Sequence, residues 1–311
     1  MILKEYKYRN KKGKAMKDYQ FIKDYKEQEH YRNSFNQLVE RTYGFNFEAW
    51  YQLGAWNENY QCYSYLAKNE VIANVSINHM QIRYQGESYP MIQIGTVMTH
   101  PDYQNQGLIR ELIKKIEADY QDKVGGFYLF ANEQVLDFYP KFGYKKQIES
   151  CYTLNYQSEK KINSSSVEKV DSQNQAHHQL IQRLIANRVS INQEFQILTM
   201  EHLEWFYYHT ALAYAIYYLP SLDSIILASC EAGKLDIFDI LTTGKLKLDE
   251  FLHEIEQEFT FEKVEFHFMP DEYWMDKIDV TPSVDNDDTL FVKPLQRNWP
   301  SQFKFPQISH A

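Results

Sequence analysis

The segment from Thr96 to Arg110, TVMTHPDYQNQGLIR, joins an extended apolar run, a polar turn and a glycine. Apolar residues then recur every three or four positions as far as Tyr120, which predicts a helix that begins after Gly107. The first turn of a helix has N–H groups without internal partners, and the helix dipole adds partial positive charge there. A glycine also lets a ligand approach the backbone closely. The segment predicts a binding site for a phosphorylated molecule, although a glycine at such a turn can also be only a tight connection.

A second strand and helix follow this segment. An apolar run from Gly125 to Asn132 is bounded by glycines and predicts a buried strand. Glu133 to Phe142 predicts a short helix, after which Gly143 is placed to end it. Tyr144 then leads into another strand. Asn132 therefore marks the end of one strand, and Tyr139 lies on the helix that follows.

With these elements in place, the stretch from about Tyr60 to Tyr156 resembles the GCN5-related N-acetyltransferase (GNAT) superfamily. The family's phosphate-loop signature, Gln/Arg-x-x-Gly-x-Gly/Ala, is represented by QNQGLI at 104–109. Its second signature, an aromatic residue and Tyr followed by a basic residue and Gly-Phe/Tyr, is represented by FYPKFGY at 138–144. The Gly-Leu-Ile-Arg variant and the long strands before it are similar to the enhanced-intracellular-survival branch of the superfamily.

The match departs from the family at two positions. Ile109 stands where most members have Gly or Ala, so we expect its side chain to pack against the helix and not beside the ligand. Gln104 replaces an arginine and removes one cation from the loop. Pyrophosphate binding would then depend on main-chain N–H groups from Gln106 to Arg110, with Arg110 supplying the charge.

The resemblance implies a mixed α/β sheet in which the strand ending at Thr99 and the strand ending at Asn132 part from each other. Acetyl-CoA would lie across this gap as co-substrate, its pantetheine arm pairing with main-chain groups of residues 97–99. An N–H of the Val97–Met98 segment would also stabilise the thioester oxygen. The implied contact residues are Val97, Met98, Thr99, Gln104, Asn105, Gln106, Gly107, Leu108, Ile109, Arg110 and Asn132.

The implied reaction is direct attack of a primary amine on the acetyl group. Tyr139 matches the tyrosine that protonates the departing CoA thiolate as general acid, although it could also be only an aromatic residue on a helix face. The general base is not evident from the sequence. Glu133 and His79 are nominees. The enhanced-intracellular-survival branch uses the C-terminal carboxylate, delivered by an extra domain, and we do not expect Ala311 to be delivered in that way.

Composition limits the classes of function. The chain has 311 residues, 44% of them hydrophobic, and a formal net charge of −9, which argues against a nucleic-acid partner and favours a cationic substrate. No uninterrupted apolar run is long enough to span a membrane, and no secretory signal is visible, so we expect a cytoplasmic protein. The three cysteines are far apart, and His177, His178, His202 and His209 lack matched ligands, so we expect no metal. Self-association remains open.

The rest of the N-terminal half fits the same fold. We expect a first strand at 19–25, helices at 27–42 and 47–53, and strands at 60–67, 71–84 and 89–99. The aromatic residues Phe45, Phe47, Trp50 and Trp56 are expected to form core or the wall of a groove. By its resemblance, this region overhangs the acceptor pocket.

The second half repeats this order of elements without its chemistry. We expect helices at 174–190, 200–212 and 247–259, and strands at 214–219, 224–230, 235–241, 263–268 and 289–293. Its strand-to-helix junction, LTTGKL at 241–246, lacks the phosphate-loop signature. The predicted domains are a disordered or upstream-start arm at 1–15, with Met16 as initiator; a catalytic domain at 16–158; a linker at 159–167; and a degenerate GNAT-like domain at 168–311. The alternative for residues 168–311 is an unrelated packing domain.

The sequence therefore predicts an acetyl-CoA-dependent N-acetyltransferase that acts on a small or peptide-borne amine. A protein of another class, a non-catalytic CoA-binding sensor or protein-interaction module, is the alternative. Thioester hydrolysis is a third and weaker hypothesis, because an open site without an amine would admit water.

Overall fold

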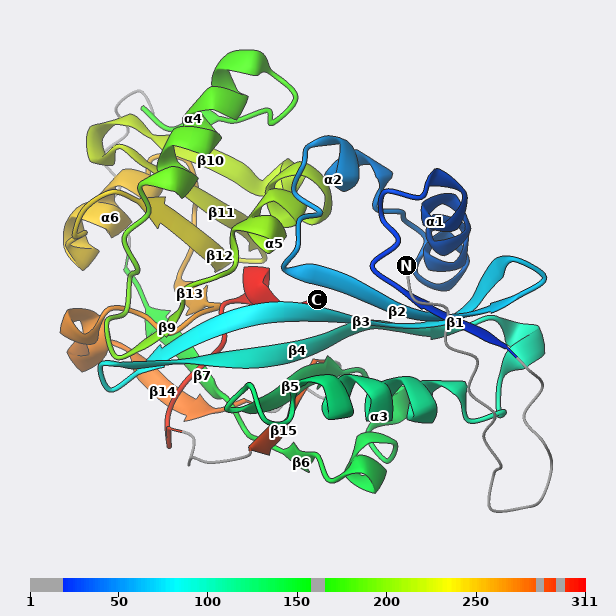
Figure 1. The fold of residues 1–311 in the computed structure, drawn as a ribbon. Helices are drawn as coiled ribbons and strands as arrows, with labels where there is room; N and C mark the ends of the chain where they lie inside the picture. Colours follow the sequence, from blue (N-terminus) through cyan, green and yellow to red (C-terminus); the bar gives the residue numbers. More distant parts are fainter. Residues whose placement is uncertain (1–18, 158–165, 284–287, 295–299) are drawn as a thin grey trace.

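The computed structural model describes residues 19–157, 166–283, 288–294 and 300–311. The expected arm at 1–15 lies outside this range, as does most of the expected linker at 159–167. The described chain forms two mixed sheets with helices packed on their faces (Figure 1). The expected mixed α/β class is confirmed. Among the described residues, no helix combines the length and the apolar character needed to cross a membrane.

The first sheet is built mainly from the N-terminal half. Its order is β1 (Gln20–Lys23), β2 (Tyr60–Ala67), β3 (Glu70–Tyr84), β4 (Glu87–Thr99), β5 (Gly126–Ala131), β15 (Thr289–Pro294) and β6 (Lys145–Lys146), with β9 (Phe195–Ile197) paired to β3. Neighbours are antiparallel except β4 and β5, which are parallel. That parallel pair is joined through a helix, as a parallel connection requires.

Three helices cover the two faces of this sheet. The helix α3 (Leu108–Tyr120) lies on one face, while α1 (Glu29–Tyr43) and α2 (Glu48–Gln52) lie on the other (Figure 1). The apolar stripe that predicted α3 is buried against the sheet, since Leu112, Ile113 and Ile116 are fully enclosed. On the opposite face, Phe35 of α1 and Trp50 of α2 are buried among aromatic side chains.

The second sheet repeats the plan. Its order is β14 (Asp279–Pro282), β7 (Ser150–Asn155), β13 (Lys263–Phe266), β12 (Lys234–Thr242), β11 (Ser224–Glu231), β10 (Ile216–Leu219) and β8 (Glu168–Lys169). The helix α6 (Leu248–Ile255) packs on one face of this sheet. The helices α4 (Gln175–Ala186) and α5 (Glu201–Phe206) precede the meander, and α5 continues as a π-helical turn at Tyr207–Ala211.

The two halves of the chain exchange strands. The strand β7, which lies within the expected first domain, pairs with β13 and β14 in the second sheet. The strand β15, from the expected second domain, enters the first sheet between β5 and β6. The expected boundary at 159–167 therefore does not separate the two sheets.

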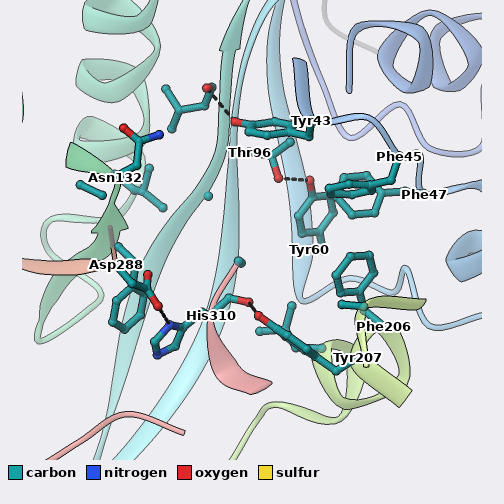
Figure 2. A pocket seen from close by; sticks show the side chains of 18 of the residues that line it. Tyr43, Phe45, Phe47, Tyr60, Thr96, Asn132, Phe206, Tyr207, Asp288 and His310 are labelled. Atoms are coloured by element: carbon teal, nitrogen blue, oxygen red, sulfur yellow. Dashed lines mark hydrogen bonds and ion pairs between the residues drawn. The ribbon is translucent and has the colours of Figure 1, made fainter. Parts of the chain in front are cut away.

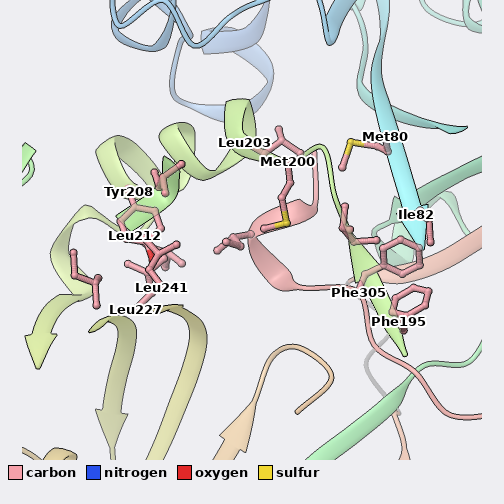
Figure 3. Close-up of a cluster of buried hydrophobic side chains, with 14 of the residues drawn as sticks. Met80, Ile82, Phe195, Met200, Leu203, Tyr208, Leu212, Leu227, Leu241 and Phe305 are labelled. Atoms are coloured by element: carbon pink, nitrogen blue, oxygen red, sulfur yellow. The ribbon is translucent and has the colours of Figure 1, made fainter. Parts of the chain in front are cut away.

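A shared hydrophobic core joins the halves. Met80 and Ile82 on β3 belong to the same buried cluster as Leu227 on β11 and Leu241 on β12 (Figure 3). Phe305, from the C-terminal segment, is fully buried in this cluster. Because the cluster draws on both sheets, removing either half would expose apolar surface of the other.

The short helix expected at 133–142 is wrong. The chain forms two separate 3₁₀ turns there, at Glu133–Val135 and Tyr139–Phe142. Pro140 explains the break, because proline lacks an N–H and fits only the first turn of a helix. Gly143 ends the second turn with φ +87°, as expected.

Candidate active site

The parallel strands β4 and β5 part within the sheet. Their pairing runs only from Ile92 opposite Phe127 to Ile94 opposite Leu129, whereas β4 continues to Thr99. Beyond Ile94, β5 remains paired on its other side with β15. The expected divergence of these two strands is confirmed.

A β-bulge coincides with the point of divergence. Gly95 pairs with Ser76 and Met98 pairs with Asn74, so that Thr96 and Val97 together oppose one residue of β3. Thr96 has φ +46°, a conformation that is costly for a β-branched residue. The fully buried Asn74 donates from Nδ2 to the Thr96 oxygen over 2.9 Å, and the hydroxyls of Tyr60 and Thr96 lie 2.8 Å apart. These contacts hold the bulge in place.

A cavity of about 750 Å³ opens at the gap. The parting strands and the turns after β5 line one side, and the aromatic side chains of the α1–α2 region and of 206–207 line the other (Figure 2). Its lining residues are Tyr43, Phe45, Phe47, Trp50, Tyr60, Ile94, Gly95, Thr96, Val97, Ile109, Phe130, Ala131, Asn132, Val135, Phe138, Tyr139, Leu203, Phe206, Tyr207, Thr210, Ala211, Asp288, Gln307, His310 and Ala311. Of the four aromatic residues expected as core or wall, Trp56 is buried core, and the other three line the cavity.

Tyr139 lies in this cavity wall. Its side chain is 5% exposed and packs against the rings of Phe138, Tyr144 and Phe291. Burial, with a smaller contribution from Tyr43, raises the pKa of the Tyr139 phenol. Tyr139 is therefore protonated at neutral pH and has a proton to donate.

The turn before α3 has the geometry of an anion site. Asn105 and Gly107 both have left-handed backbone conformations, with φ +59° and +81°. A side chain at Gly107 would meet no atom within 4 Å, so the space beside it is open. Gly107 caps α3 without a side-chain hydrogen bond, which leaves the first N–H groups of the helix available. Among the predicted loop residues 104–110, Ile109 alone borders the cavity.

Ile109 corrects one expectation. Its side chain lines the cavity and is only partly packed against the core under α3. The first helical turn directs this residue toward the gap between β4 and β5, so the branched side chain lies where a ligand would pass. The family position with Gly or Ala is thus occupied by an apolar wall residue.

Two other loop residues already have partners. Gln106 accepts a hydrogen bond through Oε1 from the Tyr19 hydroxyl over 2.9 Å. The guanidinium of Arg110 lies 5.9 Å from the centre of the Phe142 ring. Arg110 is exposed and remains the cation of this loop. Gln104 follows the 3₁₀ turn at Pro101–Tyr103, and its N–H donates to the Pro101 oxygen.

The predicted strand residues face in different directions. Val97 lines the cavity, and its main-chain oxygen accepts a 2.9 Å hydrogen bond from the Tyr43 hydroxyl (Figure 2). Met98 is buried in the aromatic cluster beneath α1 and α2, while Thr99 pairs with Ala73. On the other strand, Asn132 lines the cavity and accepts the Gln134 N–H through Oδ1 at 3.1 Å.

The C-terminal segment adds residues that local sequence patterns did not identify. Asp288 and His310 face the cavity, with Oδ2 and Nδ1 2.6 Å apart, and the His310 ring stacks on Phe130 at a centroid distance of 3.5 Å (Figure 2). Burial alone would raise the pKa of Asp288, but His310 and Gln307 hold it below the usual range. Phe206 and Tyr207 come from the second half as well. These residues are brought together only by long-range packing.

Ala311 also lies in the site, contrary to expectation. It lines the cavity, and a methyl group on Gly95 would lie 2.7 Å from the Ala311 main-chain oxygen. No extra domain is needed to deliver it, because residues 300–311 cross from the second sheet to the first (Figure 1). Neither other nominee for general base borders the cavity: Glu133 is exposed, and His79 lies against Tyr120.

Outside the cavity, one group within the described ranges has the composition of a metal site. Single ligand atoms of Asp236, Glu265 and His267 all lie within 4.8 Å of one another. Lys234 already bridges the two carboxylates, with Nζ 2.8 Å from each. Its ammonium occupies the position in which a cation would be held, so this group is an ion-pair network.

Comparisons with known proteins agree on one kind of domain. A family model described as an acetyltransferase (GNAT) domain matches residues 22–146. A chloroplastic GCN5-related N-acetyltransferase 2 from Arabidopsis thaliana is 40% identical over 57 residues, which make up 18% of this chain and 22% of the plant protein. The chain thus matches only about a fifth of that relative.

Solved structures show a similar fold over most of the chain. A probable N-acyltransferase from Enterococcus faecalis is 18% identical, with a TM-score of 0.56 over 90% of this chain and 73% of that one. Eis1 from Mycobacterium abscessus is 13% identical, with a TM-score of 0.55 over 89% of this chain and 73% of Eis1. At these identities the likeness establishes the fold alone.

Proposed function

Because residues 22–146 belong to the GNAT acetyltransferase superfamily, we propose that the protein transfers an acetyl group from acetyl-CoA to a primary amine. The observation that carries this proposal is the parting of β4 and β5 beside a deep cavity. Main-chain groups of Val97 and its neighbours have no strand partner on that side among the described pairings, and an extended amide-containing arm can pair with them.

The residues present fit the rest of the co-substrate. The uncapped N-terminus of α3 and the open space beside Gly107 suit a pyrophosphate, which accepts hydrogen bonds from main-chain N–H groups. Arg110 supplies a positive charge one turn from that position. The apolar side chain of Ile109 suits the pantetheine arm between the phosphates and the cavity.

Acetyl-CoA supplies an activated acetyl group as a thioester. In the proposed reaction, a C–N bond forms to the amine, the C–S bond breaks, and the amine gives up a proton to water. A main-chain N–H of the Val97–Met98 segment stabilises the negative charge on the acetyl oxygen. The phenol of Tyr139, which its burial keeps protonated, donates its proton to the departing sulfur and is then reprotonated from solvent.

We propose that the second half has lost this binding function and walls the acceptor site. Its parallel strands β12 and β13 also part, since their pairing ends at Ile237 while β12 continues to Thr242. The C-terminal segment lies at this point: the Gln307 N–H donates to the His267 oxygen over 2.9 Å, and Ile308 is fully buried. The protein's own chain thus takes the place that a ligand would occupy.

The test is a thiol-release assay with acetyl-CoA and a panel of amines, paired with calorimetry on desulfo-CoA. We expect heat on binding and amine-dependent release of free thiol. Binding without turnover on any amine would favour the non-catalytic sensor. Release of thiol that is independent of amine would indicate hydrolysis, and absence of both signals would end the proposal.

A further inference from the structure

The cavity is rich in aromatic side chains. Ten of the 25 lining residues are Phe, Tyr or Trp. On the side away from the phosphate turn, Phe45, Phe47 and Phe206 contact one another, with centroids 5.3 to 5.7 Å apart. Such a wall removes apolar surface from water and presents aromatic faces to a cation.

The charges of this wall are few. Asp288 is the one carboxylate side chain among the described lining residues, and lysine, arginine and glutamate are absent from that set. His310 and Gln307 keep Asp288 ionised, as its lowered pKa indicates. The acidic residues behind the net charge of −9 therefore lie largely outside this cavity.

This distribution discriminates between kinds of amine. A single ammonium can be placed near Asp288 and the aromatic faces, while an attached apolar body is buried against Phe206 and its neighbours. An amine without such a body would leave these aromatic faces in water and would gain less from binding.

We propose that the acceptor is an amine that carries an aromatic or branched apolar body. This inference rests on the proposed acetyltransferase function. It adds the substrate class, the wall that selects it and the carboxylate that receives its ammonium.

The test compares acceptors at saturating acetyl-CoA. We expect the kcat/KM of phenethylamine to exceed that of ethanolamine about ten-fold or more, because burying a ring is worth at least that factor. Ethanolamine turned over as well as phenethylamine would overturn the inference while leaving the acetyltransferase function intact.

Substitutions in the cavity wall show which side chains cause the preference among amines. Phe206→Ala should lower kcat/KM for phenethylamine about ten-fold and lower that for ethanolamine by a smaller factor. Phe206→Leu keeps most of the packing volume, so a loss in this variant too, with an unchanged melting temperature, assigns the effect to the aromatic face. Asp288→Asn should raise KM for both amines. Tyr273→Ala is the control, since this side chain is 71% exposed and lies outside the cavity.

An acyl chain of the donor is the other group that could lie against the aromatic wall, and it would give a different dependence on substrate. If the aromatic wall serves a long acyl chain of the donor, turnover should rise from acetyl-CoA to octanoyl-CoA and should not depend on the body of the amine. That pattern would overturn the inference. Absence of thiol release with every amine and donor, together with no heat from desulfo-CoA, would instead reject the proposed function itself.

Discussion

The side-chain amide of Gln93 donates from Nε2 to the main-chain oxygen of Ser309 over 2.8 Å, and both residues are fully buried. Gln93 lies on β4 next to the point where this strand leaves β5. Ser309 belongs to the segment that also lies between β12 and β13. One short segment therefore contacts the parting strands of both sheets, and it places His310 and Ala311 in the cavity.

Gly95→Ala tests whether that placement matters. The added methyl group would lie 2.7 Å from the Ala311 oxygen and 2.8 Å from its carbonyl carbon, so residues 309–311 must move. We expect a loss of stability of about 1–3 kcal/mol and a fall in kcat/KM with little change in CoA affinity. Thermal unfolding, thiol-release kinetics and calorimetry measure these three quantities.

Gly244→Ala is the matched control for this substitution. A methyl group at Gly244 would meet no atom within 4 Å, and its φ is not in the left-handed region. Its activity should equal that of the unmodified protein. If Gly95→Ala were equally silent, residues 309–311 would not be needed in their observed position.

Tyr43→Phe should tighten the binding of CoA. The Tyr43 hydroxyl now donates to the Val97 oxygen, a group that the proposed pantetheine site would use, so ligand and side chain compete. Removing a competing hydrogen bond of about 1 kcal/mol should lower the Kd for desulfo-CoA about five-fold. Calorimetry measures this change.

Tyr51→Phe removes a hydroxyl from the neighbouring helix and serves as the control. That hydroxyl donates to Glu27 and lies outside the cavity. Weaker binding in Tyr43→Phe would instead mean that Tyr43 contacts the ligand directly and stabilises the complex.

Tyr139→Phe should lower kcat about a hundred-fold without changing the Kd for CoA, because general acid catalysis contributes factors of this size. Its buried ring would be retained, so the fold should be unaffected. Tyr144→Phe is the control, since Tyr144 packs against Tyr139 but does not line the cavity. Full activity in Tyr139→Phe would remove the residue from this role.

Much of the first sheet was predictable because its signals are local. Strands at 60–67, 71–84 and 89–99 agree with β2, β3 and β4 to within two residues at each end. The helix after Gly107 followed from its apolar spacing alone. The parting of β4 and β5 was also expected, but from the family resemblance, since no local pattern distinguishes a paired from an unpaired strand edge.

Long-range arrangements were not predictable in this way. Nothing in the residues of β15 indicates that it pairs with β5 across about 160 positions of sequence, because any half-buried strand fits any apolar edge. Asp288 and His310 likewise show no local motif. They meet because β15 pairs within the first sheet and because residues 300–311 lead back to that sheet. Both arrangements depend on the packing of segments that are distant in the sequence.

A last prediction concerns a buried ion cluster behind the cavity. Arg188 pairs with Glu204 on α5 and with Asp239 on β12, where Nη2 and Oδ1 are 2.5 Å apart. Two carboxylates thus share one guanidinium, and the Tyr208 hydroxyl donates to Asp239 over 3.0 Å. Burial raises the pKa of Glu204 to about 7, with Asp239 adding to the shift and Arg188 opposing it.

The sign of the pH dependence follows from that shift. A raised pKa means that the folded protein holds this proton more tightly than the unfolded chain does. The contribution of Glu204 is therefore complete below pH 4.5 and is lost as the pH rises through about 7. We expect unfolding free energy to fall by about 1–3 kcal/mol between pH 5 and pH 8 on account of this group. Glu204→Gln, which stays neutral, should flatten this dependence and melt at a higher temperature at pH 8. The exposed Glu201→Gln on the same helix should leave the slope unchanged, and equal slopes in all three proteins would show that Glu204 is ionised throughout.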